Sequence, residues 1–249
     1  MNDQKQLIEK SEKFYRDCIP HISIDTVVFG FNQNELKVLA IKMKFNQQWF
    51  LPGGFVRKEE DIDVAAVNIL KERAGVSNIF LEEFAVFGKK GRNESHFDDY
   101  DDGLWQKQRF ISIGYYALVD YVSVSPKADA LSEKFDWLEV NSLDRYQITM
   151  DHKEIIQKAL MTLRERITYK PIGYNLLPEK FTLPELQRLY ETILGRTLNR
   201  GNFYRKIKNM DILVKLDEQR KGSARKPPDL YSFNKANYEK ALQNGINSW

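Results

Sequence analysis

The chain has 249 residues, of which 42% are hydrophobic and 29% are charged. This balance is typical of a globular protein and excludes a disordered or collagen-like chain, and the length accommodates one large or two ordinary domains. No apolar run of about 18 residues occurs and the polar N-terminus lacks a secretory signal pattern, so the sequence predicts a cytoplasmic protein. The single cysteine, Cys18, cannot form an intramolecular disulfide and offers no metal-binding spacing.

The net charge of +3 is unevenly distributed along the chain. From Pro171 onward there are 14 lysines and arginines against 8 acidic residues, which leaves 24 against 27 in residues 1–170. A mildly acidic first part followed by a basic second part predicts that the second part contacts a polyanion such as nucleic acid.

The first part contains alternating strand and helix patterns after an amphipathic lead helix that ends near Asp17. A turn at Asn32–Glu35 predicts a hairpin between the first two strands. Helical periodicity covers Asp63–Arg73 with Gly75 placed to end it, and Asp151 with Glu154 begins a helix whose apolar stripe extends to Ile167. The predicted strands are Ile22–Phe31, Leu36–Met43, Phe84–Gly88, Phe110–Val119 and Phe135–Val140.

The second part follows a linker, Tyr169–Lys180, that is rich in proline and glycine. Thr182 and Glu185 have the spacing of a capping box, which predicts a helix ending at Gly195. A second helix over Arg200–Asn209 and two short strands around a basic loop complete the pattern. We predict a winged helix-turn-helix, and therefore three regions: an N-terminal arm (1–21), a first domain (22–169) and a DNA-binding domain (170–249).

The second helix and the basic loop supply the predicted DNA contacts. Arginine pairs with guanine and asparagine with adenine in the major groove, and lysines and further arginines contact phosphates. The predicted base-reading residues are Arg200, Asn202 and Arg205. The predicted backbone contacts are Tyr204, Lys206, Lys208, Arg220, Lys221, Arg225 and Lys226.

Residues 54–76 carry a degenerate pattern. The segment resembles the Nudix box, G-x5-E-x7-R-E-U-x-E-E-x-G-U with U apolar: Gly54, Glu60, Leu70, Glu72, Gly75 and Val76 match it, whereas Asn68, Ile69 and Arg73 depart from it. In active members three glutamates at the positions of Ile69, Glu72 and Arg73 bind magnesium against a diphosphate. Only Glu72 remains here, and Arg73 would repel the ion by about 4 kcal/mol per unit charge at 4 Å and an effective dielectric of 20. The sequence therefore predicts a non-catalytic domain with no metal and no cofactor.

The whole chain resembles the Nudix-related transcriptional regulators. The stretches that carry the resemblance are residues 49–55, 150–152, 181–187, 202–206 and 230–233. The resemblance implies an α/β (α+β) Nudix-like α/β/α sandwich followed by a small winged helix-turn-helix. It also implies a homodimer that binds a palindromic double-stranded DNA operator and responds to a small molecule.

The effector is predicted from the insert at Gly91–Gln108. Its aspartates would repel a diphosphate and accept hydrogen bonds from hydroxyl groups, which favours a neutral sugar. The sequence is similar to the L-arabinose-responsive branch of the family known from gut bacteria. The predicted effector contacts are Lys44, Trp49, Arg57, His96, Asp98 and Arg109.

Each effector contact has a plainer alternative: Trp49 as a core residue, His96 and Asp98 as parts of a solvated loop, and the basic residues as solvated strand ends. His152 is predicted to cap its helix. Two alternative functions also remain at this point, an active Nudix hydrolase and an ADP-ribose-responsive regulator of nicotinamide-cofactor metabolism. A nucleic-acid-binding adaptor without an effector is a third.

Overall fold

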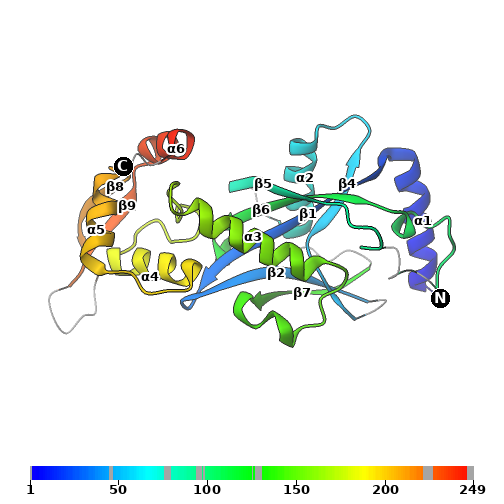
Figure 1. Cartoon of the computed structure of the whole chain (residues 1–249), viewed down its shortest axis with the longest axis horizontal. Helices are drawn as coiled ribbons and strands as arrows, with labels where there is room; N and C mark the ends of the chain where they lie inside the picture. The colour runs from blue at the N-terminus through cyan, green and yellow to red at the C-terminus, as the bar shows by residue number, and fades with distance from the viewer. Residues whose placement is uncertain are drawn as a thin grey trace. The chain divides into compact units, whose positions relative to one another are not determined.

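The structure is a computed structural model that describes residues 2–44, 47–75, 80–93, 97, 99–124, 126, 131–220 and 227–245 (Figure 1). The chain divides into two compact units. The first comprises Met1–Gly30 and Lys37–Ala159, and the second comprises Phe31–Leu36 and Leu160–Trp249. Among the described helices, none has the length and apolar character needed to cross a lipid bilayer.

A seven-stranded mixed sheet forms the centre of the first unit. The strands follow the order β3-β2-β1-β6-β5, with β4 paired to β1 and β7 paired to β2. β1 runs parallel to β6, with Ile24 opposite Ile113, whereas β4 pairs with β1 in the antiparallel direction. The strands are β1 (Cys18–Asn32), β2 (Glu35–Met43), β3 (Trp49–Phe50), β4 (Gly53–Arg57), β5 (Phe80–Phe87), β6 (Ile111–Val119) and β7 (Ser132–Glu139).

Helices α2 (Ile62–Ala74) and α3 (His152–Arg166) cover opposite faces of this sheet. Leu39 of β2 packs in one core cluster with Leu70 of α2, while the next residue, Ala40, lines a small void together with Ile156 of α3. Successive residues of a strand point to opposite faces, so the two helices form the outer layers of an α/β/α sandwich. Helix α1 (Asn2–Asp17) also belongs to this unit, as do the 3-10 turns η2 (Trp105–Lys107), η3 (Tyr121–Ser123) and η4 (Val140–Arg145).

The second unit has the order helix, turn, helix, hairpin, helix. α4 (Leu183–Leu194) and α5 (Arg200–Asn209) are followed by the antiparallel strands β8 (Leu213–Gln219) and β9 (Asp229–Phe233). The last helix, α6 (Lys235–Asn244), was not predicted from the sequence. Its buried Tyr238 donates a hydrogen bond from its hydroxyl to the carbonyl of Pro171, which ties α6 to the linker (2.9 Å).

Most predicted elements are confirmed with shifted ends. The predicted helix over Asp63–Arg73 is α2, and it ends at Gly75, whose φ of 69° places it in the left-handed region. The predicted hairpin turn is also present, with positive φ at Gln33 and Asn34. β1 and β5 each begin about four residues earlier than their sequence patterns indicate, at Cys18 and Phe80.

The capping box of α4 is present and should measurably stabilise the second unit. The Thr182 backbone N–H donates to Glu185 Oε2 at 2.7 Å, and the Glu185 N–H donates to Thr182 Oγ1 at 3.4 Å. We expect Thr182→Ala to lower the free energy of unfolding of this unit by about 1 kcal/mol, because an N-cap acceptor is lost. Urea unfolding followed by circular dichroism measures this change. Thr197→Ala, at an exposed turn position, is the control; equal effects of the two substitutions would contradict the capping role.

Candidate effector cavity and nucleic-acid interface

The α2 segment holds an apolar side chain where the Nudix pattern has its first metal-binding glutamate. Ile69 is buried in a cluster with Ile24, Val56 and Ala65. Gly54 of β4 makes room for it, because a Cβ at Gly54 would lie 2.9 Å from Ile69 Cγ1. The position is therefore part of the core and offers no oxygen ligand.

The two glutamates that match the pattern, Glu60 and Glu72, are bound to other side chains. Asn68, at the arginine position of the pattern, donates from Nδ2 to Glu60 Oε1 at 2.6 Å. Glu72 Oε1 accepts from Arg57 Nη2 at 3.3 Å, in a pair whose side chains are more than 60% exposed. Within the described ranges, no group of three His, Cys, Asp or Glu side chains is arranged to hold a metal ion. These residues do not fit the magnesium that the Nudix fold implies.

A cavity of about 630 Å³ lies beside this segment in the first unit. Its volume is in the range of pockets that bind small organic ligands. Aromatic side chains from four parts of the unit line it, and so do several charged groups. The aromatic residues are Phe14, Phe50, Phe55, Phe97 and Phe110, and the cationic residues are Lys10, Lys13, Arg57, Arg73 and Arg92.

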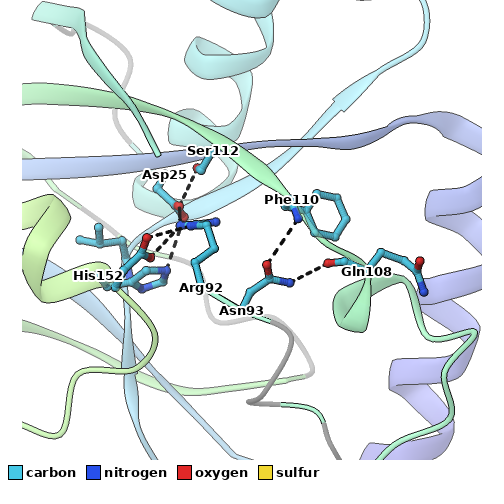
Figure 2. Close-up of polar contacts among 9 residues, drawn as sticks. Asp25, Arg92, Asn93, Gln108, Phe110, Ser112 and His152 are labelled. Atoms are coloured by element: carbon cyan, nitrogen blue, oxygen red, sulfur yellow. Dashed lines mark hydrogen bonds and ion pairs between the residues drawn. The ribbon is translucent and has the colours of Figure 1, made fainter. Parts of the chain in front are cut away.

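Part of the cavity wall is a buried charge network centred on Arg92 (Figure 2). The Arg92 guanidinium donates to both carboxylate oxygens of Asp151 at 2.8 Å, and to Asp25 Oδ2 at 2.9 Å. Ser112 of β6 donates its hydroxyl to the same Asp25 oxygen at 2.6 Å. The network thus joins β1, β6, the segment after β5 and the start of α3.

The charges of this network are mutually stabilised. Burial favours the neutral form of Asp25, but the neighbouring His152 and Arg92 and the hydrogen bond from Ser112 outweigh it, so the pKa of Asp25 lies below its usual value. Burial likewise disfavours the charged form of Arg92, yet Asp151 and Asp25 hold the pKa of Arg92 above its usual value. Both groups are therefore charged at neutral pH.

His152 links α3 to the turn that carries the Nudix-like segment. Its Nδ1 accepts a hydrogen bond from the Leu51 N–H at 3.0 Å, which leaves the ring proton on Nε2. Nε2 lies 3.6 Å from Asp25 Oδ1. The sequence interpretation gave His152 a helix-capping role; the structure instead places it between the start of α3, the Leu51–Gly54 turn and the cavity.

Asn93 positions a second part of the wall. Its Nδ2 donates to the carbonyl oxygens of Gln106 (3.1 Å) and Gln108 (2.7 Å), and its Oδ1 accepts from the Phe110 N–H at 3.4 Å (Figure 2). One buried polar atom nearby, Gln106 Oε1, has no hydrogen-bond partner, and Gln106 lines the cavity.

Of the four predicted effector contacts that the structure describes, only Arg57 lines the cavity. Trp49 is half-buried in β3 with Lys134 over its ring, and it does not line the cavity. Arg109 is exposed and donates to the Gly88 carbonyl at 3.2 Å, and Lys44 is an exposed residue at the end of β2. Neither lines the cavity. His96 and Asp98 lie outside the described residues.

Among the described residues of the acidic insert, no aspartate lines the cavity, so Asp99, Asp101 and Asp102 give no support to a neutral sugar. Asp101 Oδ1 accepts from the Gly103 N–H at 2.8 Å, and Asp102 pairs with Lys107 at 2.8 Å. Asp99, Asp101 and Asp102 are exposed. The insert instead contributes Arg92, Asn93, Phe97 and Gln106 to the cavity.

The exposed face of α5 carries the predicted base-reading residues. Arg200, Asn202 and Arg205 are exposed, whereas Phe203 and Ile207 are buried. Arg205 Nη2 donates to Asn202 Oδ1 at 3.1 Å, and the Arg200 guanidinium lies 5.2 Å from the ring centre of Tyr204. The helix therefore presents a pre-ordered row of hydrogen-bonding groups.

The predicted backbone contacts fall into three groups. Lys206 and Lys208 are exposed on α5, and Lys206 donates from Nζ to the Thr168 carbonyl at 3.2 Å. Arg220 donates from Nη2 to both oxygens of Glu185, at 2.7 and 2.6 Å, and so fixes the base of the hairpin to α4. Lys221, Arg225 and Lys226 lie outside the described residues.

Sequence reasoning missed the residues that form the buried network, Asp25, Arg92 and Asp151, and the contribution of the lead helix. A signal was present for Asp25, because a carboxylate within an otherwise buried strand requires a partner. The sequence held no comparable signal for Arg92, which lies in an insert with many other charged and polar residues.

Comparisons with known proteins agree with this architecture. Residues 20–159 match the NUDIX domain family and residues 173–233 match the NrtR DNA-binding winged helix domain. The "ADPR responsive transcriptional repressor NtrR" of Acinetobacter baylyi is 28% identical over 225 residues, covering 88% of this chain and 84% of the relative. The "ADP-ribose pyrophosphatase" of Methanocaldococcus jannaschii is 25% identical over 158 residues, covering 61% of this chain and 82% of the relative.

Crystal structures of Shewanella oneidensis NrtR have the same fold as this chain. The free protein is 25% identical with a TM-score of 0.71, covering 88% of this chain and 96% of NrtR. The complex of that protein with a 27mer DNA superposes with the same TM-score at 24% identity, covering 88% and 95%. The predicted fold class is confirmed, and the chain belongs to the Nudix family, with a Nudix domain followed by a winged helix domain of the NrtR DNA-binding type.

Proposed function

We propose that the chain is a DNA-binding transcriptional repressor whose Nudix domain binds ADP-ribose, or a closely similar nucleoside diphosphate sugar, without hydrolysing it. The observation that carries this proposal is a Nudix domain that retains a ligand-sized cavity while Ile69 and Arg73 occupy two of its three metal-ligand positions. Such a domain can recognise a ligand but lacks the oxygen ligands for magnesium.

The DNA-binding part of the proposal rests on α5 and on the similarity of residues 173–233 to the NrtR winged helix. An exposed row of arginine and asparagine side chains at the front of a second helix suits base recognition in the major groove. We propose that the protein acts as a homodimer on a palindromic operator, since each winged helix would then read one half-site.

ADP-ribose is preferred to L-arabinose as the effector for two reasons. The described cavity wall has five cationic residues, and the described aspartates of the acidic insert do not line it. A pentose would also fill only a small part of about 630 Å³. The A. baylyi relative, named as ADPR responsive, supports the same choice.

Helix α3 provides a physical route from the cavity to the second unit. It begins at the buried network, where Arg92 holds Asp151, and it continues across the division between the units after Ala159. A ligand that draws Arg92 away from Asp151 would change how the start of α3 is held. By linkage, if the ligand weakens operator binding by some factor, the operator weakens ligand binding by the same factor.

Operator binding with and without ligand tests the proposal. An operator is first selected from random-sequence DNA with the full chain, and its affinity is then measured by fluorescence anisotropy at fixed salt. We expect saturating ADP-ribose to weaken operator binding about 10-fold or more, within the usual range of coupling free energies, and L-arabinose to leave it unchanged. The reverse result would identify the pentose as the effector.

A hydrolysis assay separates this proposal from an active pyrophosphohydrolase. ADP-ribose incubated with the full chain and magnesium should remain intact, with AMP release measured by chromatography. Magnesium-dependent turnover that is lost in Glu72→Gln would contradict the non-catalytic assignment.

A further inference from the structure

The cavity wall carries a set of cations on the side of the former metal site. Lys10 and Lys13 come from α1, Arg57 comes from β4 and Arg73 comes from α2. We call these four residues the cation set. Four acidic residues also line the cavity: Asp17, Asp25, Glu60 and Glu72. Glu72 accepts a hydrogen bond from Arg57 and Asp25 accepts one from Arg92. Among the charged residues that line the cavity, cations outnumber carboxylates by five to four.

We infer that the cation set binds the phosphate groups of the effector directly, with no bridging metal ion. This inference rests on the proposed function, that the cavity takes a phosphate-bearing ligand. Arg73 stands at a pattern position where active Nudix domains have a metal-binding glutamate, so a protein cation replaces both the ligand and its ion there. Arginine also matches the phosphate geometry with two parallel hydrogen bonds.

The lead helix α1 is held in place for this role. Ser11 Oγ accepts the Trp105 N–H at 2.8 Å in a buried contact, and the Phe14 ring lies 4.8 Å from the Phe55 ring. Lys10, Lys13 and Phe14 are three and four residues apart, so they lie on one face of the helix. The contacts of Ser11 and Phe14 therefore fix the two lysines beside the cavity.

The pair of Arg57 with Glu72 distinguishes this inference from binding through a metal ion, because the two predict opposite effects on affinity when Glu72 is replaced. In the absence of ligand Glu72 pairs with Arg57, in an exposed contact that a phosphate would compete with. Replacing Glu72 by glutamine frees Arg57 and removes a negative charge from the cavity. A direct cation site should then bind a diphosphate more tightly, whereas a magnesium site would lose its last glutamate and bind it more weakly.

The experiment is isothermal titration calorimetry of ADP-ribose into the full chain in EDTA. We expect binding without a divalent ion, weakened about 10-fold or more per cation removed in Lys10→Gln/Lys13→Gln and in Arg73→Gln, because charge-assisted hydrogen bonds are lost. Lys5→Gln, an exposed residue of the same helix that does not line the cavity, is the matched control and should bind as wild type. Glu72→Gln should bind at least as tightly as wild type. Thermal unfolding checks that each variant is folded.

Inorganic pyrophosphate, titrated in parallel, separates failure of this inference from failure of the proposed function. Suppose that the wild type binds pyrophosphate but not ADP-ribose, and that Lys10→Gln/Lys13→Gln no longer binds pyrophosphate. ADP-ribose is then not the effector, but the cation set is still a phosphate site. If ADP-ribose binds only with magnesium, or if folded cation variants bind it as wild type does, the inference is overturned. Binding of L-arabinose with no binding of either phosphate compound overturns both.

Discussion

Replacing Arg92 by methionine is expected to lower the free energy of unfolding of the first unit by about 3–5 kcal/mol at pH 7. Asp25 and Asp151 would remain buried, each about 10% exposed, without the cation that both now share. Removing one partner of a buried ion pair has a cost of this size because the desolvated charge is left uncompensated. Urea unfolding followed by tryptophan fluorescence measures the change, since Trp49, Trp105 and Trp137 all lie in the first unit.

The pH dependence of the stability lost in Arg92→Met identifies the cause of that loss. The folded-state pKa of Asp25 is depressed, so its contribution to stability is present above the unfolded-state pKa of about 3.9 and is lost as the pH falls through the folded value. Without Arg92, one of the groups that offset burial is lost, and burial favours protonation of Asp25. The stability difference between Arg92→Met and wild type should therefore be largest near pH 7 and smaller near pH 5.

Two further variants serve as controls. Arg145→Met removes an arginine that is 76% exposed and lies 3.9 Å from Glu139. We expect this substitution to lower the free energy of unfolding by less than about 0.5 kcal/mol. Adding Asp25→Asn and Asp151→Asn to Arg92→Met should recover part of the loss, because the unpaired charges are then removed. If Arg92→Met lowers the free energy of unfolding by less than about 1 kcal/mol, or by the same amount at both pH values, the network does not stabilise the fold.

The outline of the fold could be predicted because each element buries a face that its own sequence reveals. The strand at Ile22–Phe31 is mostly apolar since helices cover both faces of the sheet, and α2 and α4 have end signals in Gly75 and in the capping box. Helix α6 was missed because its amphipathic pattern is short and its apolar residue Tyr238 packs against the linker, a distant contact that periodicity does not register.

The candidate site was harder to predict because its parts come together only through the fold. Asp25 and Arg92 are 67 residues apart, and Arg92 and Asp151 are 59 apart. The aspartates of the insert, by contrast, form local contacts: Asp101 with Gly103 and Asp102 with Lys107. The sequence interpretation took the aspartates of the insert as acceptors for the hydroxyl groups of a sugar, whereas Asp101 accepts a local backbone hydrogen bond and Asp102 pairs with a nearby lysine.

Replacing both Arg200 and Arg205 by alanine is expected to remove about 100-fold or more of the preference for the selected operator over random DNA. A bidentate arginine–guanine contact contributes about 1–3 kcal/mol of discrimination, and two such residues lie on the exposed face of α5. Loss of Arg205 also releases the Asn202 amide, to which it now donates at 3.1 Å. Fluorescence anisotropy with operator and random duplexes, at several salt concentrations, measures both affinities.

Comparing the affinities for operator and random DNA distinguishes base recognition from general attraction to DNA. The double variant should keep the weak, salt-sensitive binding that depends on phosphate contacts. Lys208→Ala, on the same helix, should instead weaken binding to both duplexes alike and reduce the salt slope by about 1, while Lys240→Ala on α6 should change neither. If the double arginine variant retains operator preference, then another element reads the bases and α5 serves only to hold the backbone. Because Phe203 and Ile207 anchor α5 from its buried side, substitution of its exposed arginines tests recognition without removing the packing that holds the helix.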